Sequence, residues 1–513
     1  MSRSVISLCL IIFLFLCTTP VSAKQQSPQS LRELILLGLE TNLGLQAVQL
    51  NIPISQASIT VEDAVFDAEF FASAGYSDVS TPISSTLSLT DSSDSQQLSG
   101  NLGLRKKLKT GLSAAFSLNT EWVDDNNISD DLSPRYRTSL SVDLVQPLMR
   151  GAGTAVNSTS LQLSRNTNRQ ASLESQFEAQ ILALQIEALC SRLVGVTEVV
   201  QLRLAAQNLA EELVTANQRR FDAGVIPVSE LQESQTALAD RLLNVSLSVQ
   251  DNHWQFEELN QLLEHKLPEG FDVSEFYDFT AEVVSRQLPA FEPLYAAALQ
   301  KRLDLKVSDI DIDGADLRRE FYRNQLKPQL DLKFQAGISG LSGEERSSAG
   351  NSYYAGEWTD SFVGAAETDG YQWGVAIDLS LPLGNRAAKA RLRQAELQKR
   401  QVGYRKQTLE ATLKTELRQR RINLLHALEQ VKIAEEFERL AEISLNQEQR
   451  RLDEGLSDTF RLLSFQDKMI NAKIGRVDAL VQYYGSIAQM NFYRGIILEQ
   501  HQIYLENGKG VSP

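Results

Sequence analysis

Two stretches of about 70 residues, 153–222 and 385–454, contain no proline. Proline kinks or ends a helix because its ring removes a backbone donor and clashes with the preceding turn. A straight helix of that length would reach roughly 100 Å at 1.5 Å per residue. Apolar residues in both stretches recur at alternating spacings of four and three: Leu182, Ile186, Leu189, Leu193, Val196 and Val200 in the first, and Leu413, Leu417, Leu424, Leu428 and Val431 in the second. This spacing is typical of a coiled-coil seam, so two very long, packed helices are predicted.

Three segments of the first half recur in the same order in the second half. Residues 39–45 resemble 299–305, residues 142–148 resemble 377–383, and residues 218–224 resemble 449–455. The separations are 260, 235 and 231 residues, so the halves differ mainly by an insertion in the first. Each half is predicted to contain a first helix, strands, and two long helices joined by a glycine turn. The first helix is expected to begin near Ser30, which with Glu33 has the spacing of a capping box.

Segments that precede each long helix alternate between apolar and polar residues, the pattern of a strand with two different faces. The apolar positions are Phe70, Ala72, Ala74 and Tyr76; Leu140, Val142 and Leu144; Leu330, Leu332, Phe334, Ala336 and Ile338; and Tyr371, Trp373, Val375, Ile377, Leu379 and Leu381. Asp, Lys, Gln and Ser occupy positions between them, as on the wall of a water-filled barrel. A soluble sandwich would also have one apolar face, and the strands alone leave that alternative open.

The first half carries a further candidate hairpin. Two strand faces are formed by Leu98, Leu102 and Leu104, and by Leu112, Ala114, Phe116, Leu118 and Trp122. A turn at residues 109–111 would join them. Three placements stay open: a longer outer loop, packing near the middle of the helices, or replacement of one of the strands named above. Polar stretches such as 78–97 and 343–369 are predicted to be surface loops.

The N-terminus has the features of a secretory signal peptide. Arg3 gives a positive start, residues 5–17 form an apolar run, and residues 21–23 are small enough for cleavage after Ala23. The apolar run is shorter than the about 20 residues that a membrane-spanning helix needs. Leu16 precedes Cys17, where a lipoprotein signal would place a small residue, so lipidation of Cys17 is the less favoured alternative.

The predicted organisation is a signal peptide (1–23), a first repeat (24–264), a linker (265–293), a second repeat (294–505) and a C-terminal tail (506–513). A net charge of −15 argues against a nucleic-acid binder, which needs a concentrated basic face. After residue 23 no uninterrupted apolar stretch reaches transmembrane-helix length. A membrane-inserted mature chain would therefore use strands, which need only about 9–11 residues. Cys190, the one cysteine beyond the signal, is predicted to be a packed residue.

The sequence does not indicate an enzyme. The four histidines, His253, His265, His426 and His501, are far apart and lack metal-ligand spacing. The sequence has neither a phosphate-binding loop nor the G-x-S-x-G motif of a serine nucleophile. Acidic residues on the helices are interpreted as solvated faces and partners of Arg and Lys. We therefore expect no catalytic activity, cofactor or metal.

The repeated motifs resemble those of the TolC-like family of outer-membrane efflux and secretion channels. The resemblance rests on residues 146–148 and their counterpart 381–383, on the paired Arg-x-x-x-Gly turns, and on Pro328 just before a strand. It covers essentially the whole mature chain. The first half departs from the family pattern at residues 66–68, where Phe-Asp-Ala stands in place of the proline segment.

Membership of this family would imply a mainly α fold with a β-barrel part. Three copies, each with four strands, would form a twelve-stranded transmembrane barrel continued by a long α-helical coiled-coil tunnel across the periplasm. Asp143 and Asp378 would then line the pore. The implied function is a passive exit channel in the outer membrane, which works with an inner-membrane RND or ABC-type pump and a periplasmic adaptor (membrane fusion) protein.

The resemblance also implies roles for the helix turns. Glycine tolerates the left-handed conformation that ends a helix, and in the family these turns form the periplasmic tip at which adaptor hairpins dock. The candidate docking residues are Arg220, Gly224, Val225, Arg451, Gly455 and Leu456. Good helix-turn chemistry would account for the same residues without any docking role.

Just beyond those turns, the family closes its pore with acidic residues and salt bridges. At the matching offset after the first turn stands Glu230, followed one helical turn later by Glu233. After the second turn the matching positions hold Arg461 and Ser464, and Asp458 lies one turn earlier. We treat Glu230, Glu233, Asp458 and Arg461 as the candidate gate. Like charges from three copies would repel one another near the axis unless they were paired. Solvated carboxylates that stabilise helix starts are the competing interpretation. Arg461 and Ser464 stand where the best-known family member has a pair of aspartates, so the sequence leaves open whether the gate binds cations.

A periplasmic coiled-coil adaptor or scaffold that never enters a membrane is the main alternative function. It would share the export signal and the long helical hairpins. The strand pair in each half and the lack of a separate lipoyl-like β domain argue against it. The sequence does not indicate the cargo, which could be a drug, a metal or a protein.

Overall fold

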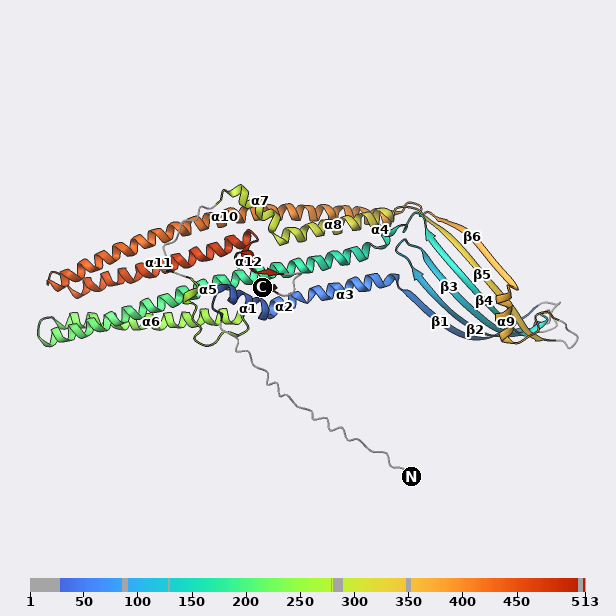
Figure 1. The fold of residues 1–513 in the computed structure, drawn as a ribbon, viewed down its shortest axis with the longest axis horizontal. Helices are drawn as coiled ribbons and strands as arrows, with labels where there is room; N and C mark the ends of the chain where they lie inside the picture. Colours follow the sequence, from blue (N-terminus) through green and yellow to red (C-terminus); the bar gives the residue numbers. More distant parts are fainter. Residues whose placement is uncertain are drawn as a thin grey trace, which may run out of the picture.

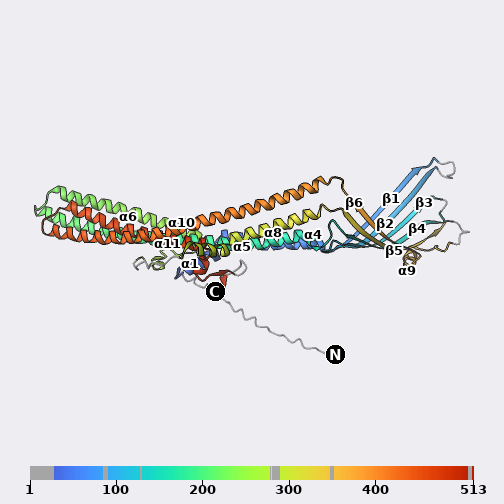
Figure 2. The same ribbon diagram turned by 90° about the horizontal axis from the view of Figure 1, so that it is seen from above.

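The structure is a computed structural model that describes residues 28–84, 91–127, 130–277, 279, 289–346, 352–505 and 511–512. The signal peptide predicted for residues 1–23 and most of the predicted tail lie outside these residues. Long helices occupy one end of the elongated chain and a curved sheet occupies the other (Figures 1 and 2). The predicted combination of a long helical part with a strand part is therefore confirmed.

The helices follow the same order in the two halves. The first half has α1 (Leu31–Thr41), α2 (Leu43–Gln49), α3 (Asn51–Asp63), the 3-10 turn η1 (Ala64–Phe66), α4 (Thr154–Asn157), α5 (Thr159–Asp222), α6 (Val228–Leu262) and η2 (Ser274–Phe276). The second has α7 (Phe291–Lys301), α8 (Leu303–Asn324), α9 (Trp358–Glu367), α10 (Arg386–Asp453), α11 (Thr459–Tyr493) and α12 (Ile497–Gln500). A short strand pair, β7 (Tyr504–Leu505) and β8 (Val511–Ser512), follows. The two proline-free stretches form α5 and α10, as predicted.

The helical core is built on the predicted seam. Ile186, Leu193 and Leu417 are almost completely buried, and they belong to one apolar cluster that joins both halves. Helix α5 contains an 18-residue window apolar enough to cross a membrane, but 67% of that window is buried within the chain. The apolar character of this window is therefore explained by its packing in the helical core. Cys190 lies in the same core, and burial raises the pKa of its thiol.

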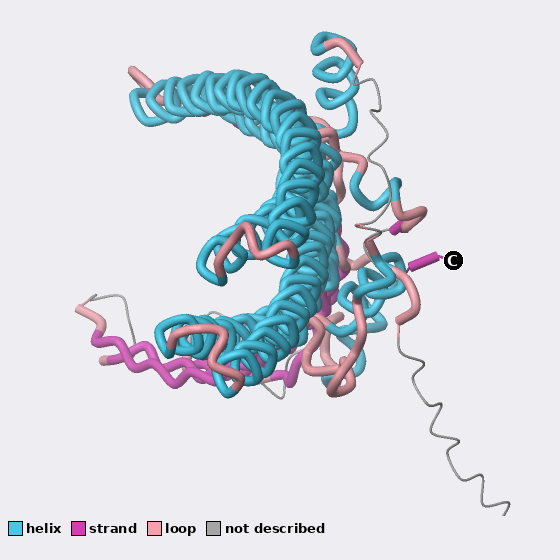
Figure 3. The backbone as a smooth tube through the Cα atoms, turned by 90° about the vertical axis from the view of Figure 1, so that its left-hand side faces the viewer, coloured by secondary structure: helices cyan, strands magenta, loops and turns pink. Residues whose placement is uncertain are grey.

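The long helices form one curved layer. Helices α5 and α6 make one hairpin, α10 and α11 make the other, and α5 packs against α11 between them. Gly195 of α5 faces Val481 of α11 so closely that a Cβ atom would clash with that valine. Seen from the end opposite the sheet, the layer is an arc that is open on one side (Figure 3).

Corresponding residues of the two halves break the shorter helices. Asn42 separates α1 from α2, and Arg302 separates α7 from α8. Their backbone angles nearly coincide, with φ −61° and ψ 116° at Asn42 and φ −63° and ψ 122° at Arg302. The Asn42 side chain accepts a hydrogen bond from the Leu45 backbone N–H at 2.9 Å. The repeated motif 39–45 and 299–305 therefore encodes the same helix break twice.

The strands form one antiparallel sheet in chain order: β1 (Ala68–Pro82), β2 (Ser92–Lys107), β3 (Ser113–Asp125), β4 (Leu132–Pro147), β5 (Gln329–Glu345) and β6 (Gly370–Ser380). The prediction of four strands in each copy of the chain was wrong, because this sheet has six strands. The candidate hairpin at 98–122 supplies β2 and β3, which lie between two of the expected strands. The loop predicted at 78–97 was also largely wrong, since β1 and β2 extend into it.

The two faces of this sheet differ in polarity across all six strands. One row of directly paired residues, from β1 to β6, is Phe70, Leu104, Phe116, Val142, Ala336 and Trp373. A row on the other face is Ser73, Asn101, Asn119, Ser139, Ser339 and Gly370. Side chains alternate across a strand, so the register keeps apolar residues on one side throughout.

Helix α9 lies on the apolar face at the end of the sheet far from the helices (Figure 1). A hydroxyl hydrogen bond of 2.8 Å joins Thr138 of β4 to Ser361 of α9, and the Trp358 Nε1–H donates to Thr120 of β3 at 2.8 Å. The loop predicted at 343–369 was therefore wrong over α9. Gly340 of β5 permits the contact, because its Cα faces the α9 backbone directly.

We expect the substitution Gly340→Ala to displace α9 from the sheet. An added Cβ would clash with backbone atoms of Ser361, Gly364 and Ala365, which cannot rotate away as a side chain would. Proteolysis within residues 352–368 should become faster than in the unaltered protein. Gly374→Ala in β6 is the control, since a Cβ there meets nothing within 4 Å. Equal proteolysis of the two variants would contradict the prediction.

Candidate pore lining and helix tips

The polar face of the sheet carries both residues predicted to line a pore. Asp143 of β4 lies between Ala115 and Gln335, and the Ser141 hydroxyl donates to its carboxylate at 3.4 Å. Asp378 of β6 forms an ion pair with Lys333 of β5. The two carboxylates are therefore on the same face, on strands separated by β5.

Charges of both signs lie on this polar face. Arg105 of β2 forms two hydrogen bonds with Glu69 of β1, at 2.8 and 2.6 Å, and both side chains are exposed. Ion pairs on exposed surfaces are screened by water and salt. The face is hence strongly hydrated and mixed in charge, which suits an aqueous wall without a preference for one sign.

The two helix tips end in the same way. Gly224 and Gly455 have φ values of +72° and +74°, in the left-handed region that favours glycine. The backbone N–H of Val225 donates to Arg220 at 2.9 Å, and that of Leu456 donates to Arg451 at 2.7 Å. These bonds satisfy carbonyl groups at the helix end in a Schellman motif.

Apolar side chains are exposed at both tips. Val225 and Leu456 are 66% and 64% exposed, and Phe460 next to the second tip is 66% exposed. Sequence reasoning missed Phe460, although its position just after a helix start could have indicated a solvent-facing residue. An apolar patch at the end of a long hairpin is a typical contact surface for another protein.

One polar network at the tips links the two hairpins. The Thr459 hydroxyl of α11 accepts a hydrogen bond from Asn217 of α5 at 3.3 Å and donates to Glu230 of α6 at 3.2 Å. Asn217 and Thr459 are buried. Glu230, one of the predicted gate residues, is therefore tied to the other half of the chain.

A second network lies within the α10–α11 hairpin. Glu448 has a buried carboxylate that accepts a hydrogen bond from Ser457. It forms ion pairs with Arg461 at 3.6 Å and Arg451 at 3.7 Å. The Asp458 carboxylate caps α11 by accepting from the Arg461 backbone N–H at 2.8 Å. Arg461 is thus held by α10 and by its own helix start.

The structure joins three of the four candidate gate residues to these networks. Glu233 is exposed on α6 and, within the described part of the chain, has no hydrogen bond or ion pair to the other three. The residues that sequence reasoning missed are Asn217 and Glu448. Each directly precedes one copy of the repeated Gln-Arg-Arg motif. Each also occupies the same heptad position as a buried alanine seven residues earlier, Ala210 for Asn217 and Ala441 for Glu448. A polar residue at a heptad position that is otherwise apolar is the sequence signal that identifies both residues.

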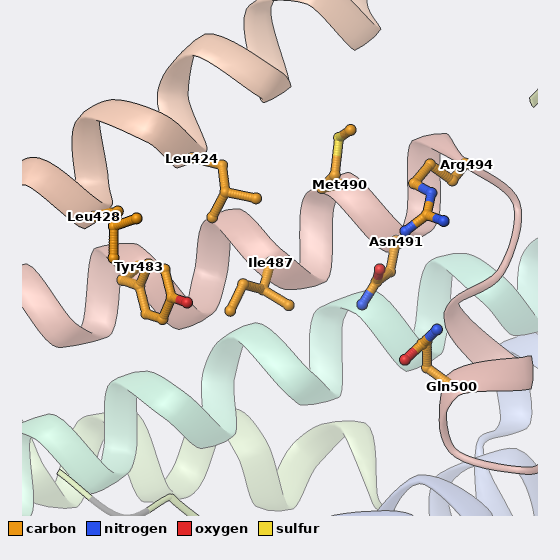
Figure 4. A pocket seen from close by; sticks show the side chains of 8 residues that line it. All are labelled: Leu424, Leu428, Tyr483, Ile487, Met490, Asn491, Arg494 and Gln500. Carbon is orange, nitrogen blue, oxygen red and sulfur yellow. The ribbon is translucent and has the colours of Figure 1, made fainter. Parts of the chain in front are cut away.

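A pocket of about 170 Å³ lies between α10, α11 and α12 (Figure 4). Its apolar wall includes Leu424, Leu428 and Ile487, and its polar end includes Arg494 and Gln500. Burial lowers the pKa of the Arg494 guanidinium. A cavity of this size is no conduit, and the helices form an open arc. A passage along the molecule would therefore need more than one copy of the chain.

Residues 294–493 match the model of the outer membrane efflux protein family. No curated protein matches the chain.

Solved outer-membrane channels share the fold over most of the chain. The CmeC channel of Campylobacter jejuni superposes with a TM-score of 0.64 and 14% identity, over 91% of this chain and 86% of that one. VceC of Vibrio cholerae gives 0.62 and 15%, over 91% and 96%. The open state of MtrE from Neisseria gonorrhoeae gives 0.60 and 15%, over 91% and 88%. The second half of this chain therefore matches the outer membrane efflux protein family, and the chain as a whole has the fold of these outer-membrane proteins.

Proposed function

We propose that three copies of this chain form the outer-membrane exit channel of a tripartite efflux or type I secretion system. An inner-membrane pump and a periplasmic adaptor would supply the drive and the selectivity. The observation that carries the proposal concerns the two long borders of the described chain: the sheet edges β1 and β6 are unpaired there, and the helices along both borders expose large apolar side chains. A curved layer with two such borders is completed by further copies of itself.

The borders on the helical side are apolar. One border follows α3 and α6, and the other follows α10 (Figure 1). Large apolar side chains are exposed along both: Ile54 and Val61 on α3; Leu243, Leu247 and Trp254 on α6; and Tyr404, Ile433, Phe437 and Leu440 on α10. Different surfaces on the two borders make a head-to-tail contact, which closes into a ring when the rotation permits.

Transport through such a ring needs no chemical step. The polar sheet face, with Asp143 and Asp378, would line the membrane passage, and the apolar face would contact lipid. Substrate would move down the gradient that the pump creates. We accordingly infer a channel without catalytic activity, cofactor or resident metal.

The tips would bind the adaptor and hold the entrance closed. Arg220, Gly224, Val225, Arg451, Gly455 and Leu456 form the proposed docking surface, with Phe460 added. Glu230, Glu233, Asp458 and Arg461 form the proposed gate, to which we add Glu448 and Asn217. Opening would require α11 to move relative to α10 as well as to α5 and α6, which breaks the contact of Arg461 with Glu448 and the contacts of Thr459.

Cell fractionation and bilayer recording test the channel function. Native protein should require detergent for release from the outer-membrane fraction, have the mass of three chains, and conduct ions across planar bilayers. Recovery as a soluble periplasmic protein without detergent would favour the adaptor alternative and overturn the channel.

Charge at the helix tips should abolish transport without affecting assembly. Val225→Glu combined with Leu456→Glu replaces two exposed apolar contacts with charges that an adaptor would have to desolvate. We expect efflux in cells to fall at least about tenfold, while outer-membrane location and the mass of the complex stay the same. Glu454→Ala, an exposed neighbour at the second tip, is the control. Normal efflux by the double variant would rule out these tips as the docking site.

A further inference from the structure

We propose that the membrane barrel of this protein has eighteen strands, closed by pairing of β1 in one copy with β6 in the next. The proposal rests on the ring of three copies argued above, and it names the contact that closes this ring. The partner that each free sheet edge binds is therefore a second copy of the same chain.

The first support is that β2 and β3 belong to the wall of the sheet. They pair along their length with β1 and β4, and their side chains continue both faces without a change of polarity. β2 has 16 residues and β3 has 13, each more than the about 9–11 needed to cross a membrane. A loop folded over a narrower barrel would not keep this alternation in register with its neighbours.

The second support is the position of the β2–β3 turn. Its tip is fixed at the junction between strands and helices, where the Gly153 backbone N–H donates to the Thr110 carbonyl at 3.0 Å. Lys109 forms an ion pair of 2.7 Å with Asp63 at the end of α3. The hairpin thus begins at the same level as the neighbouring strands, between the ends of α3 and α4.

The third support is that the two free edges match. β1 leaves α3 and runs away from the helices, whereas β6 returns from the far end to α10 (Figure 1). Strands that run in opposite directions can continue an antiparallel ladder across copies. Within the described residues, β1 and β6 each pair on one side only, with 15 and 11 residues. Unpaired edges of this length do not persist in a lipid bilayer, because their backbone groups would lack partners.

The expected result is a barrel wider than one of twelve strands. At ordinary strand spacing and a tilt near 40°, eighteen strands give a diameter of about 35 Å, whereas twelve give about 23 Å. At the end of the described sheet that faces the helical part, the strands connect to four helices, α3 (through η1), α4, α8 and α10, whereas α9 lies at the far end. The additional hairpin therefore widens the exit without adding a helix to the tube.

Cysteine cross-linking between copies tests the closing contact. Ala74→Cys in β1 would be combined, one at a time, with Tyr371→Cys, Trp373→Cys, Val375→Cys and Ile377→Cys in β6, all on the apolar face. At least one pair should give a covalent ladder up to three chains on denaturing gels after mild oxidation. The controls combine Ala74→Cys with Gln372→Cys or Ala376→Cys, which point to the polar face. Cys190 is buried and should stay unreactive.

Mass and imaging separate the failure of this proposal from the failure of the proposed function. A three-chain complex with cross-links on the apolar face only, and a barrel near 35 Å across in single-particle images, supports eighteen strands. A conducting three-chain complex without any of these cross-links, or with a barrel near 23 Å, overturns the eighteen-stranded barrel and leaves the channel in place. A two-chain complex that cross-links would contain twelve strands and overturn the proposal. A soluble monomer would overturn the channel function as well.

Discussion

Replacing Glu448 with alanine is expected to raise the resting conductance of the channel by on the order of tenfold. Its buried carboxylate holds Ser457, Arg451 and Arg461 at the tip. Loss of a charge-assisted contact of this kind costs about 1.5–3 kcal/mol, and 1.4 kcal/mol corresponds to about a factor of ten in an equilibrium. The closed arrangement of α10 and α11 should therefore become less stable relative to the open arrangement.

Single-channel recording in planar bilayers measures this change. Arg461→Ala should act in the same direction, because it removes a partner of the same carboxylate. Glu436→Ala is the matched control on α10, since Glu436 pairs with Arg439 at 2.6 Å in an exposed position away from the tip. A resting conductance equal to that of the control would show that Glu448 does not hold the entrance closed.

A second substitution, Arg302→Ala, is expected to destabilise the protein by about 3–5 kcal/mol, the usual cost of breaking a buried ion pair. The Arg302 guanidinium is buried, donates to Asp304 at 2.9 and 2.5 Å, and contacts three aromatic rings. Its centre lies 5.2 Å from Phe177 of α5 and 5.3 Å from Phe492 of α11. Arg302 thus joins the first repeat to the second, and its loss leaves a cavity and an unpaired carboxylate.

The free energy of unfolding in urea, measured on detergent-solubilised protein, tests this effect. Lys301→Ala is the control, because the neighbouring Lys301 forms an exposed ion pair with Glu499 at 2.5 Å. Exposed pairs contribute only about 0–1 kcal/mol. Arg302→Lys should recover little of the loss, since lysine lacks the planar fork that binds Asp304 and stacks on rings. Similar stability of the alanine variants at 301 and 302 would contradict the prediction.

Local patterns in the sequence predicted the individual helices and strands better than they predicted which strands pair with one another. The four-and-three spacing that begins at Leu182 identified α5, and the alternation around Trp373 identified β6. Alternation also revealed the hairpin at 98–122, but it does not determine which strands it pairs with. Pairing of β2 with β1 depends on contacts between distant residues, and the resemblance to a four-stranded family supplied the wrong number. Helix α9 was missed because its flanking Gly, Ser and Asp residues are typical of loops.

The candidate site was partly predictable for a related reason. The glycine turns mark the tips by conformation alone, so Gly224 and Gly455 could be located from the sequence. The partners of Arg461 could not, because they lie on the other side of the turn in the sequence. Glu448 precedes the turn and reaches Arg461 only because α10 and α11 are antiparallel neighbours. Pairing across a hairpin is a property of the fold, which the linear spacing does not contain.

The position of the β2–β3 turn has a consequence for how such proteins evolve. A hairpin fixed between the ends of α3 and α4 lengthens the sheet without displacing a helix. In a ring of three identical subunits, one inserted hairpin in the gene adds six strands to the assembled wall. The diameter of such a ring can therefore change in fixed steps, while the opposite end of the molecule, about 100 Å away at the length of α10, keeps its surface unchanged.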